Sequence, residues 1–282
     1  MQSDYSIKSI FRQYKWKISS TFLLLILENA FKVLQPFVLG IAINDLLNKS
    51  EKGLLLFGCL YIAGFIIGVI RRYYDTRAYT SIYTNIASEI AEIQNEKQIN
   101  ISSIAARSAL VKELVDFFEQ DVTQGFSSVI SVIGALVMLL LFDPWIFLSC
   151  LITIVLIILI YRLSNSKIYN YNIGLNDELE DRITVLNSRN PNQIKTHFRG
   201  ISNWLVKLSD LETLNFGIIE ILLFVLAIFT IYLSASVDTA SAGSIFSAIT
   251  YVLEFSGGVF MLPFIYQQTI RLKEISSRLS QV

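Results

Sequence analysis

Six apolar stretches dominate the hydrophobic pattern of the chain, and polar segments of unequal length separate them. Each stretch is close to the ~20 residues that an α-helix needs to cross ~30 Å of hydrocarbon. The pattern therefore predicts an all-α membrane protein with six transmembrane helices. The predicted spans are Thr21–Ile43, Leu54–Ile70, Gly125–Phe142, Trp145–Tyr161, Asn215–Leu233 and Gly243–Tyr266.

The segments between the spans alternate between short loops and long insertions. The long ones cover residues 71–124 and 162–214. In the first, Ile82, Ile86 and Ile90 repeat at the four-residue spacing of a helix, with glutamates on another face. Each insertion therefore predicts a helical hairpin, called an arm below, that reaches ~35–40 Å beyond the membrane. The turns of the two arms are expected at Asn100–Ser103 and at residues 188–192.

Lysine and arginine are unequally distributed between the two sides of this pattern. The amino-terminal stretch, the two insertions and the carboxyl-terminal tail hold nearly all of them, whereas the three short loops hold only Lys49 and Lys52. Positive residues are retained on the cytoplasmic side of a membrane. We therefore expect both termini and both arms to be cytoplasmic, in a multi-pass protein of the inner membrane of a bacterium.

The composition adds to this picture mainly by exclusion. The chain is 53% hydrophobic and 16% charged, whereas soluble domains carry about 25% charged residues. Its single histidine, His197, falls near the second turn, where a solvated or contact role is expected, and no His/Cys cluster predicts a metal site. No nucleophile–base pair is apparent. We therefore expect no enzyme activity, no cofactor and no nucleic-acid partner.

Several local sequences accompany the six spans and the two arms. An amphipathic segment around residues 7–12 precedes the first span, Leu27-Glu28-Asn29-Ala30 lies within that span, and Asp143-Pro144-Trp145 separates the third span from the fourth. Together these features resemble the transmembrane domain of ABC exporters over nearly the whole chain. The resemblance implies an elbow over residues 1–16 and a six-span domain over residues 17–282. It also implies a homodimer in which spans four and five cross to the partner.

The sequence departs from complete ABC exporters in one respect. A phosphate-binding loop requires Gly-x-x-x-x-Gly-Lys-Ser/Thr, and the chain contains no Gly-Lys dipeptide. We therefore expect no ATPase domain, and the resemblance implies a separate ATPase subunit that contacts the tips of the arms. The candidate docking residues are Asn100, Ile101, Ser102, Asn192, Gln193 and Ile194.

Three glutamates lie within predicted spans, where a charge costs at least ~2.5–3.5 kcal/mol at the bilayer centre. Glu28 has Lys32 one helical turn away, Glu220 lies at the inner end of span five, and Glu254 lies near the middle of span six. Two interpretations remain open. Glu28 and Lys32 can form a structural ion pair, or Glu28, Lys32, Glu220 and Glu254 can line a path for substrate or protons.

Three functions remain compatible with these observations. The leading hypothesis is the membrane subunit of a homodimeric transporter driven by a separate ATPase. The second is an ATP-independent, proton-coupled transporter similar to the SbmA/BacA peptide-uptake proteins, in which the intramembrane glutamates would couple transport to protons. The third is a membrane assembly or regulatory protein that does not transport. Copurification with an ATPase separates the first from the other two, and proton-dependent uptake separates the second from the third.

Overall fold

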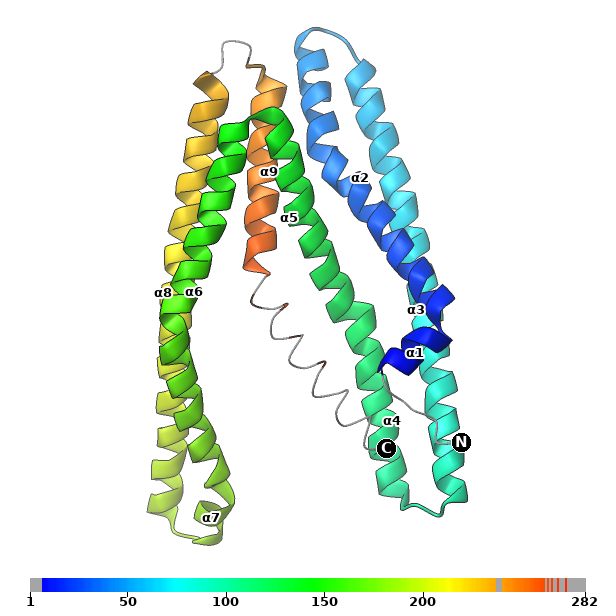
Figure 1. Ribbon diagram of the computed structural model, residues 1–282, viewed down its shortest axis with the longest axis vertical. Helices are drawn as coiled ribbons and strands as arrows, with labels where there is room; N and C mark the ends of the chain where they lie inside the picture. The colour runs from blue at the N-terminus through cyan, green and yellow to red at the C-terminus, as the bar shows by residue number, and fades with distance from the viewer. Residues whose placement is uncertain are drawn as a thin grey trace. The chain divides into compact units, whose positions relative to one another are not determined.

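The computed structural model describes residues 7–236 and 240–261, together with positions 263, 265, 268 and 272 (Figure 1). The first six residues of the predicted elbow, the inner end of the predicted sixth span at Tyr266 and the basic tail lie outside the described residues. Throughout the described part, the regular elements are helices. Six of them are long and apolar enough to cross a membrane. These are Lys15–Leu47, Lys52–Glu96, Ser108–Phe142, Pro144–Asn187, Pro191–Ser236 and Ala242–Phe260.

The chain divides into two compact units, each described here by itself. Unit 1 comprises Met1–Asp143 and Leu233–Val282, and unit 2 comprises Pro144–Tyr232. The elements of unit 1 are α1 (Ile7–Gln13), α2 (Lys15–Leu47), α3 (Lys52–Glu96), α4 (Ile101–Asp116), the π-helical turn η1 (Phe117–Val122), α5 (Thr123–Phe142) and α9 (Ala242–Phe260). The elements of unit 2 are α6 (Pro144–Glu180), α7 (Arg182–Asn187) and α8 (Pro191–Ser236).

Helices α2 and α3 form a tight antiparallel hairpin and lie side by side along their length (Figure 1). The turn between them passes through Lys49, whose φ is 59°. The Asp45 carboxylate accepts a hydrogen bond of 2.8 Å from the Gly53 amide at the start of α3. A side chain at Gly53 would collide with the Ala42 backbone at 2.7 Å. The hairpin therefore closes tightly at this end, which fixes the register of the two helices.

The first arm is formed by the carboxyl-terminal part of α3, which follows the predicted second span, and by α4. Its core contains Ile82, Ile86 and Ile90 of α3 packed with Val111 and Leu114 of α4, and the helical spacing of the isoleucines places them on one buried face. The turn differs slightly from the predicted one. The chain reverses over residues 97–100, and α4 already begins at Ile101 because the Asn100 side chain caps it by accepting from the Ser102 amide.

Helix α9 packs against α2 through two glycines. A Cβ at Gly243 would lie 1.9 Å from the Gly40 carbonyl oxygen, so the backbones of the two helices touch. Farther along α9 from this contact, Ser247 donates to the Pro36 carbonyl oxygen at 2.8 Å, and Tyr251 donates to the Val33 carbonyl oxygen at 2.7 Å. Pro36 lies inside α2, where proline weakens the local backbone hydrogen bonding. Side chains of α9 thus supply donors to α2 around the proline.

Unit 2 is a long hairpin of α6 and α8. Ser164 donates to Asn215 at 2.7 Å, and Gly174 leaves room for the Trp204 ring, which a Cβ would approach to 2.6 Å. The tip reverses over residues 188–190, and Pro191 opens α8, as is common at the first position of a helix. This turn lies within the range predicted from the sequence.

Candidate functional site

A cavity of about 440 Å³ lies in unit 1 between α2, α3 and α9. This volume is within the usual range for small-molecule sites. Its walls combine charged, polar and apolar side chains. The lining residues are Glu28, Lys32, Gln35, Tyr61, Gly64, Phe65, Gly68, Val69, Arg72 and Glu254. Three helices that belong to separate predicted spans therefore contribute to one open cavity with a mixed polar and apolar lining.

Glu28 lies at the wall of this cavity and is buried with both carboxylate oxygens paired. Lys32 Nζ lies 2.7 Å from Oε1, and Arg71 Nε forms an ion pair with Oε2. Gly68 of α3 faces the same carboxylate, and a Cβ there would lie 3.4 Å from Glu28 Cδ. Glu28 therefore lies at the centre of an ion-pair cluster.

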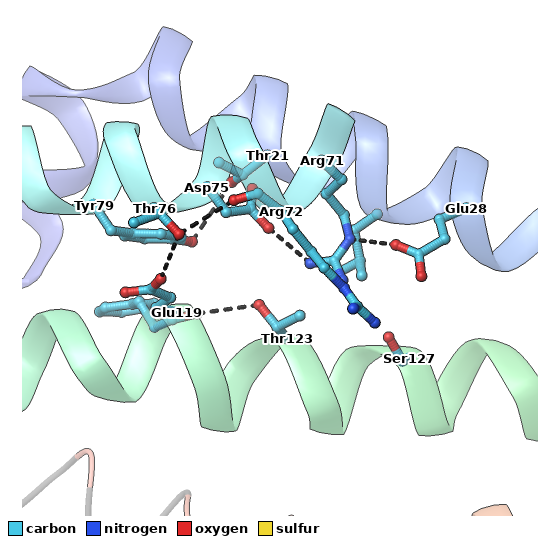
Figure 2. A network of polar contacts seen from close by, with 12 residues as sticks. Thr21, Glu28, Arg71, Arg72, Asp75, Thr76, Tyr79, Glu119, Thr123 and Ser127 are labelled. Carbon is cyan, nitrogen blue, oxygen red and sulfur yellow. Dashed lines mark hydrogen bonds and ion pairs between the residues drawn. The ribbon is translucent and has the colours of Figure 1, made fainter. Parts of the chain in front are cut away.

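The cluster continues from the cavity toward the first arm (Figure 2). Arg71 Nη1 lies 2.7 Å from Asp75 Oδ2, and Asp75 is buried. One residue farther along α3, Thr76 lies 3.4 Å from a carboxylate oxygen of Glu119 in η1. A chain of polar contacts thus connects α2 through α3 to the π-helical turn, where the first arm leads into α5.

Glu254 and Arg72 line the cavity with opposite charges and differ from Glu28 in their pairing. Glu254 is half-buried. Within the ranges that the structure describes, neither its carboxylate nor the Arg72 guanidinium forms an ion pair or side-chain hydrogen bond. In Figure 2 the Arg72 side chain runs from α3 toward the side of α5, and no dashed line ends on its guanidinium. The cavity therefore presents one unpaired anion and one unpaired cation.

The structure brings together three of the four charged residues proposed for the path. Glu28, Lys32 and Glu254 line the same cavity. Glu220 lies on α8 in unit 2, where its side chain is exposed. The ion pair of Glu28 with Lys32, which sequence proximity suggested, is present at 2.7 Å. Their participation in transport remains a hypothesis.

The candidate docking residues lie at the turns of the two arms. Asn100, Ile101 and Ser102 are exposed at the first turn, and Asn192 and Gln193 are exposed at the second, with Ile194 half-buried beside them. The two turns are built alike, because Asn190 accepts from the Asn192 amide at 3.0 Å, as Asn100 does from Ser102.

Of the two roles expected for His197, solvated or contact, the structure shows a contact. His197 is buried in the second arm, and its Nδ1 lies 3.1 Å from Glu178 Oε2. Gly200 creates the space for Glu178, because a Cβ there would lie 2.6 Å from Oε1. The residues that the structure describes include no group of three or more His, Cys, Asp or Glu side chains able to hold a metal ion.

Sequence reasoning missed Arg71, Arg72 and Asp75 as site residues because it treated the arginines only as markers of orientation. The hairpin register would have revealed Arg71. Asp45 contacts Gly53 close to the turn, and Thr21 lies 3.5 Å from Tyr79 far from it. Residues at equal distances from an antiparallel turn lie opposite each other, which places the partner of Glu28 near Arg71.

The comparison with known families agrees with this architecture. The sequence profile described as the ABC transporter transmembrane region matches residues 7–243, which is most of the chain. No curated protein sequence matches the chain. The 282 residues contain no nucleotide-binding domain. The chain therefore belongs to the ABC transporter transmembrane region family and is a membrane-embedded component of a transporter.

Proposed function

We propose that this protein is the membrane subunit of a homodimeric transporter, that its substrate passes through the cavity between α2, α3 and α9, and that a separate ATPase subunit drives it. The cavity carries the proposal. A charged group inside a membrane protein normally faces a partner or an aqueous path, and Glu254 faces a cavity with no ion-pair partner among the described residues. A purely structural scaffold does not need this arrangement.

The arm tips support the part of the proposal that concerns the ATPase. Ile101 is 81% exposed at the first turn, and Ile183 of α7 is 72% exposed near the second. Both side chains lie beyond the predicted spans, so lipid does not cover them. Apolar side chains exposed to water at the ends of two long arms are suited to contact another protein.

The division of the chain supports the homodimer. Helices α6 and α8 form a unit with its own interhelical contacts, such as the hydrogen bond from Ser164 to Asn215. An exchange of spans four and five between two copies requires a hairpin that holds together by itself. The side-chain contacts between α6 and α8, from Ser164–Asn215 to Glu178–His197, are compatible with such an exchange.

The test is affinity purification of the tagged full chain from its native cells. We expect an ATPase subunit to copurify in stoichiometric amount and Ile101→Asp with Ile183→Asp to abolish its retention. The control replaces both residues by leucine, which keeps the apolar surface. Purification without any ATPase, or full retention by the aspartate variant, would refute docking at the arm tips.

A proton-coupled transporter that works without ATP is the second candidate, and the unpaired Glu254 favours it. This candidate predicts uptake into ATP-free vesicles under an inward proton gradient. Glu254→Gln should remove the dependence on the gradient, and Glu92→Gln, at an exposed position of α3 outside the cavity lining, serves as the control. Uptake that requires an ATPase and ignores the gradient would exclude this candidate.

A further inference from the structure

We propose that the cavity binds a zwitterionic amphiphile, with a primary ammonium group at Glu254, an anionic group at Arg72 and an apolar body along α3. The inference rests on the proposed transport function and specifies the substrate class. A short apolar peptide and an aminophospholipid share this chemistry. The arguments concern charge, position and surface in turn.

The charge argument follows from the pairing inside the cavity. Both oxygens of Glu28 are already occupied, one by Lys32 and one by Arg71. Glu254 and Arg72 are then left as one free charge of each sign among the described lining residues. Because the two side chains do not pair with each other, a ligand that carries one cationic and one anionic group can form an ion pair with each of them. Glu254 is half-buried and Arg72 is exposed at the edge of the cavity, and a ligand with a single charge would pair with only one of them.

The position argument uses the contacts between the helices. Tyr251 of α9 bonds the Val33 carbonyl of α2, and Glu254 follows Tyr251 by about one helical turn. Gly68 of α3 faces Glu28, and Arg72 follows Gly68 by about one turn. Both free charges therefore lie near the level of Glu28 in the bundle. They approach the cavity from two different helices and can hold a ligand between them.

The surface argument concerns the face of α3 that ends at Arg72. Tyr61, Phe65 and Val69 recur at four-residue spacing, so they share this face, and all three line the cavity and are exposed. The stripe gives an apolar wall directly beside the guanidinium. An arginine fits carboxylate or phosphate through paired hydrogen bonds. The site thus matches an anionic group with an apolar body attached.

The experiment measures binding to the purified full chain in phosphatidylcholine nanodiscs, using radiolabelled Leu-Leu-Leu and dihexanoyl-phosphatidylethanolamine as the two probes. Three control ligands each lack one feature. The N-acetyl tripeptide lacks the ammonium group, the tripeptide amide lacks the carboxylate, and dihexanoyl-phosphatidylcholine has no N–H donor. Saturable binding of either probe is expected, with at least about tenfold weaker binding of its control, because the control lacks one of the paired charges or the N–H donor. The probe that binds identifies the source of the ligand.

The variants assign each end of the ligand. Glu254→Gln should bind the free and acetylated peptides equally, or phosphatidylethanolamine and phosphatidylcholine equally. Arg72→Gln should bind the acid and the amide equally, and should lose about tenfold or more in affinity for phosphatidylethanolamine. A variant that only perturbs the fold would weaken all ligands together and leave these ratios unchanged. Glu92→Gln and Arg77→Gln, at exposed positions of α3 outside the cavity lining, are the matched controls and should behave as wild type.

Two results would overturn the inference. One is the absence of saturable binding of both probes by the wild-type chain. The other is a Glu254→Gln or Arg72→Gln variant in which the affinity of each probe relative to its control ligand is the same as in the wild type. Because ATPase copurification is measured separately, a chain that retains its ATPase but binds neither probe would reject the ligand class and leave the transport proposal standing.

Discussion

Arg71 is the residue whose removal should most disturb the bundle around the cavity. Its side chain is only 12% exposed, and it contacts the carboxylates of Glu28 and Asp75, which are 6% and 7% exposed. We consider Arg71→Met, which keeps much of the apolar length and removes the charge. Glu28 would keep Lys32. Asp75 would lose its only ion-pair partner among the described residues, and its Oδ1 already has no hydrogen-bond partner.

The expected cost follows from the burial of these groups. Removing one partner of a buried ion pair typically destabilises a protein by ~3–5 kcal/mol, because the remaining charge stays desolvated. The Glu28–Lys32 pair persists in the variant, but it contacts only Oε1, and Oε2 of the buried Glu28 carboxylate loses its ion-pair partner. We therefore expect Arg71→Met to lower the free energy of unfolding by about 3 kcal/mol or more.

The assay is reversible unfolding of the purified chain in mixed micelles with increasing sodium dodecyl sulfate. Arg77→Met is the control in the same helix, because Arg77 lies over the exposed ring of Tyr73, and surface substitutions usually change stability by less than about 0.5 kcal/mol. The triple variant Glu28→Gln, Arg71→Met, Asp75→Asn removes the buried charges together and should recover most of the loss. An unfolding free energy of Arg71→Met equal to that of wild type, or a triple variant as unstable as the single one, would refute the reasoning.

Three further predictions concern packing, orientation and assembly. Gly243→Ala should destabilise the bundle by roughly 1–3 kcal/mol, because its Cβ would lie 1.9 Å from the Gly40 carbonyl oxygen. Gly257→Ala is the control in the same unfolding assay. It has open space around it and should be neutral or slightly stabilising. Cysteines introduced at Ser50, Ser102 and Asn192 test the orientation: an impermeant reagent outside intact cells should label Ser50→Cys alone, and labelling of either arm site would reverse the topology. Mass measurement in mild detergent should give a dimer, and a stable monomer at all concentrations would contradict the exchange of spans.

The six spans were predictable because each is a long apolar run, and helix length is set by the thickness of the bilayer. The arms were recognisable from the spacing of Ile82, Ile86 and Ile90. The first turn was placed a few residues late, because the capping role of Asn100 starts α4 at Ile101. Polar residues such as Ser102 are acceptable both in a loop and in the first turn of a helix, so composition alone does not decide between them.

The site was less predictable because its pairs come from different helices. Glu28 and Lys32 are one turn apart in one helix, so their ion pair follows from sequence spacing. Arg71 and Glu28 meet only once the α2–α3 hairpin has its register. The burial of His197 depends on Glu178 of another helix and on the absence of a side chain at Gly200. Such contacts depend on tertiary packing, which hydropathy and periodicity do not describe.

Arg71 and Arg72 show how one helix separates a structural charge from a free one. Consecutive residues on an α-helix point about 100° apart, so Arg71 faces Glu28 and Asp75 while Arg72 lines the cavity. Any rotation of α3 that carries Arg72 toward or away from the cavity also moves Arg71 against the buried Glu28 carboxylate of α2. The position of Arg72 is therefore tied to the ion-pair cluster, and the same helix continues into the first arm. A change at the cavity wall and a movement of that arm consequently involve the same helix, and the Glu28–Arg71 ion pair between α2 and α3 resists the motion.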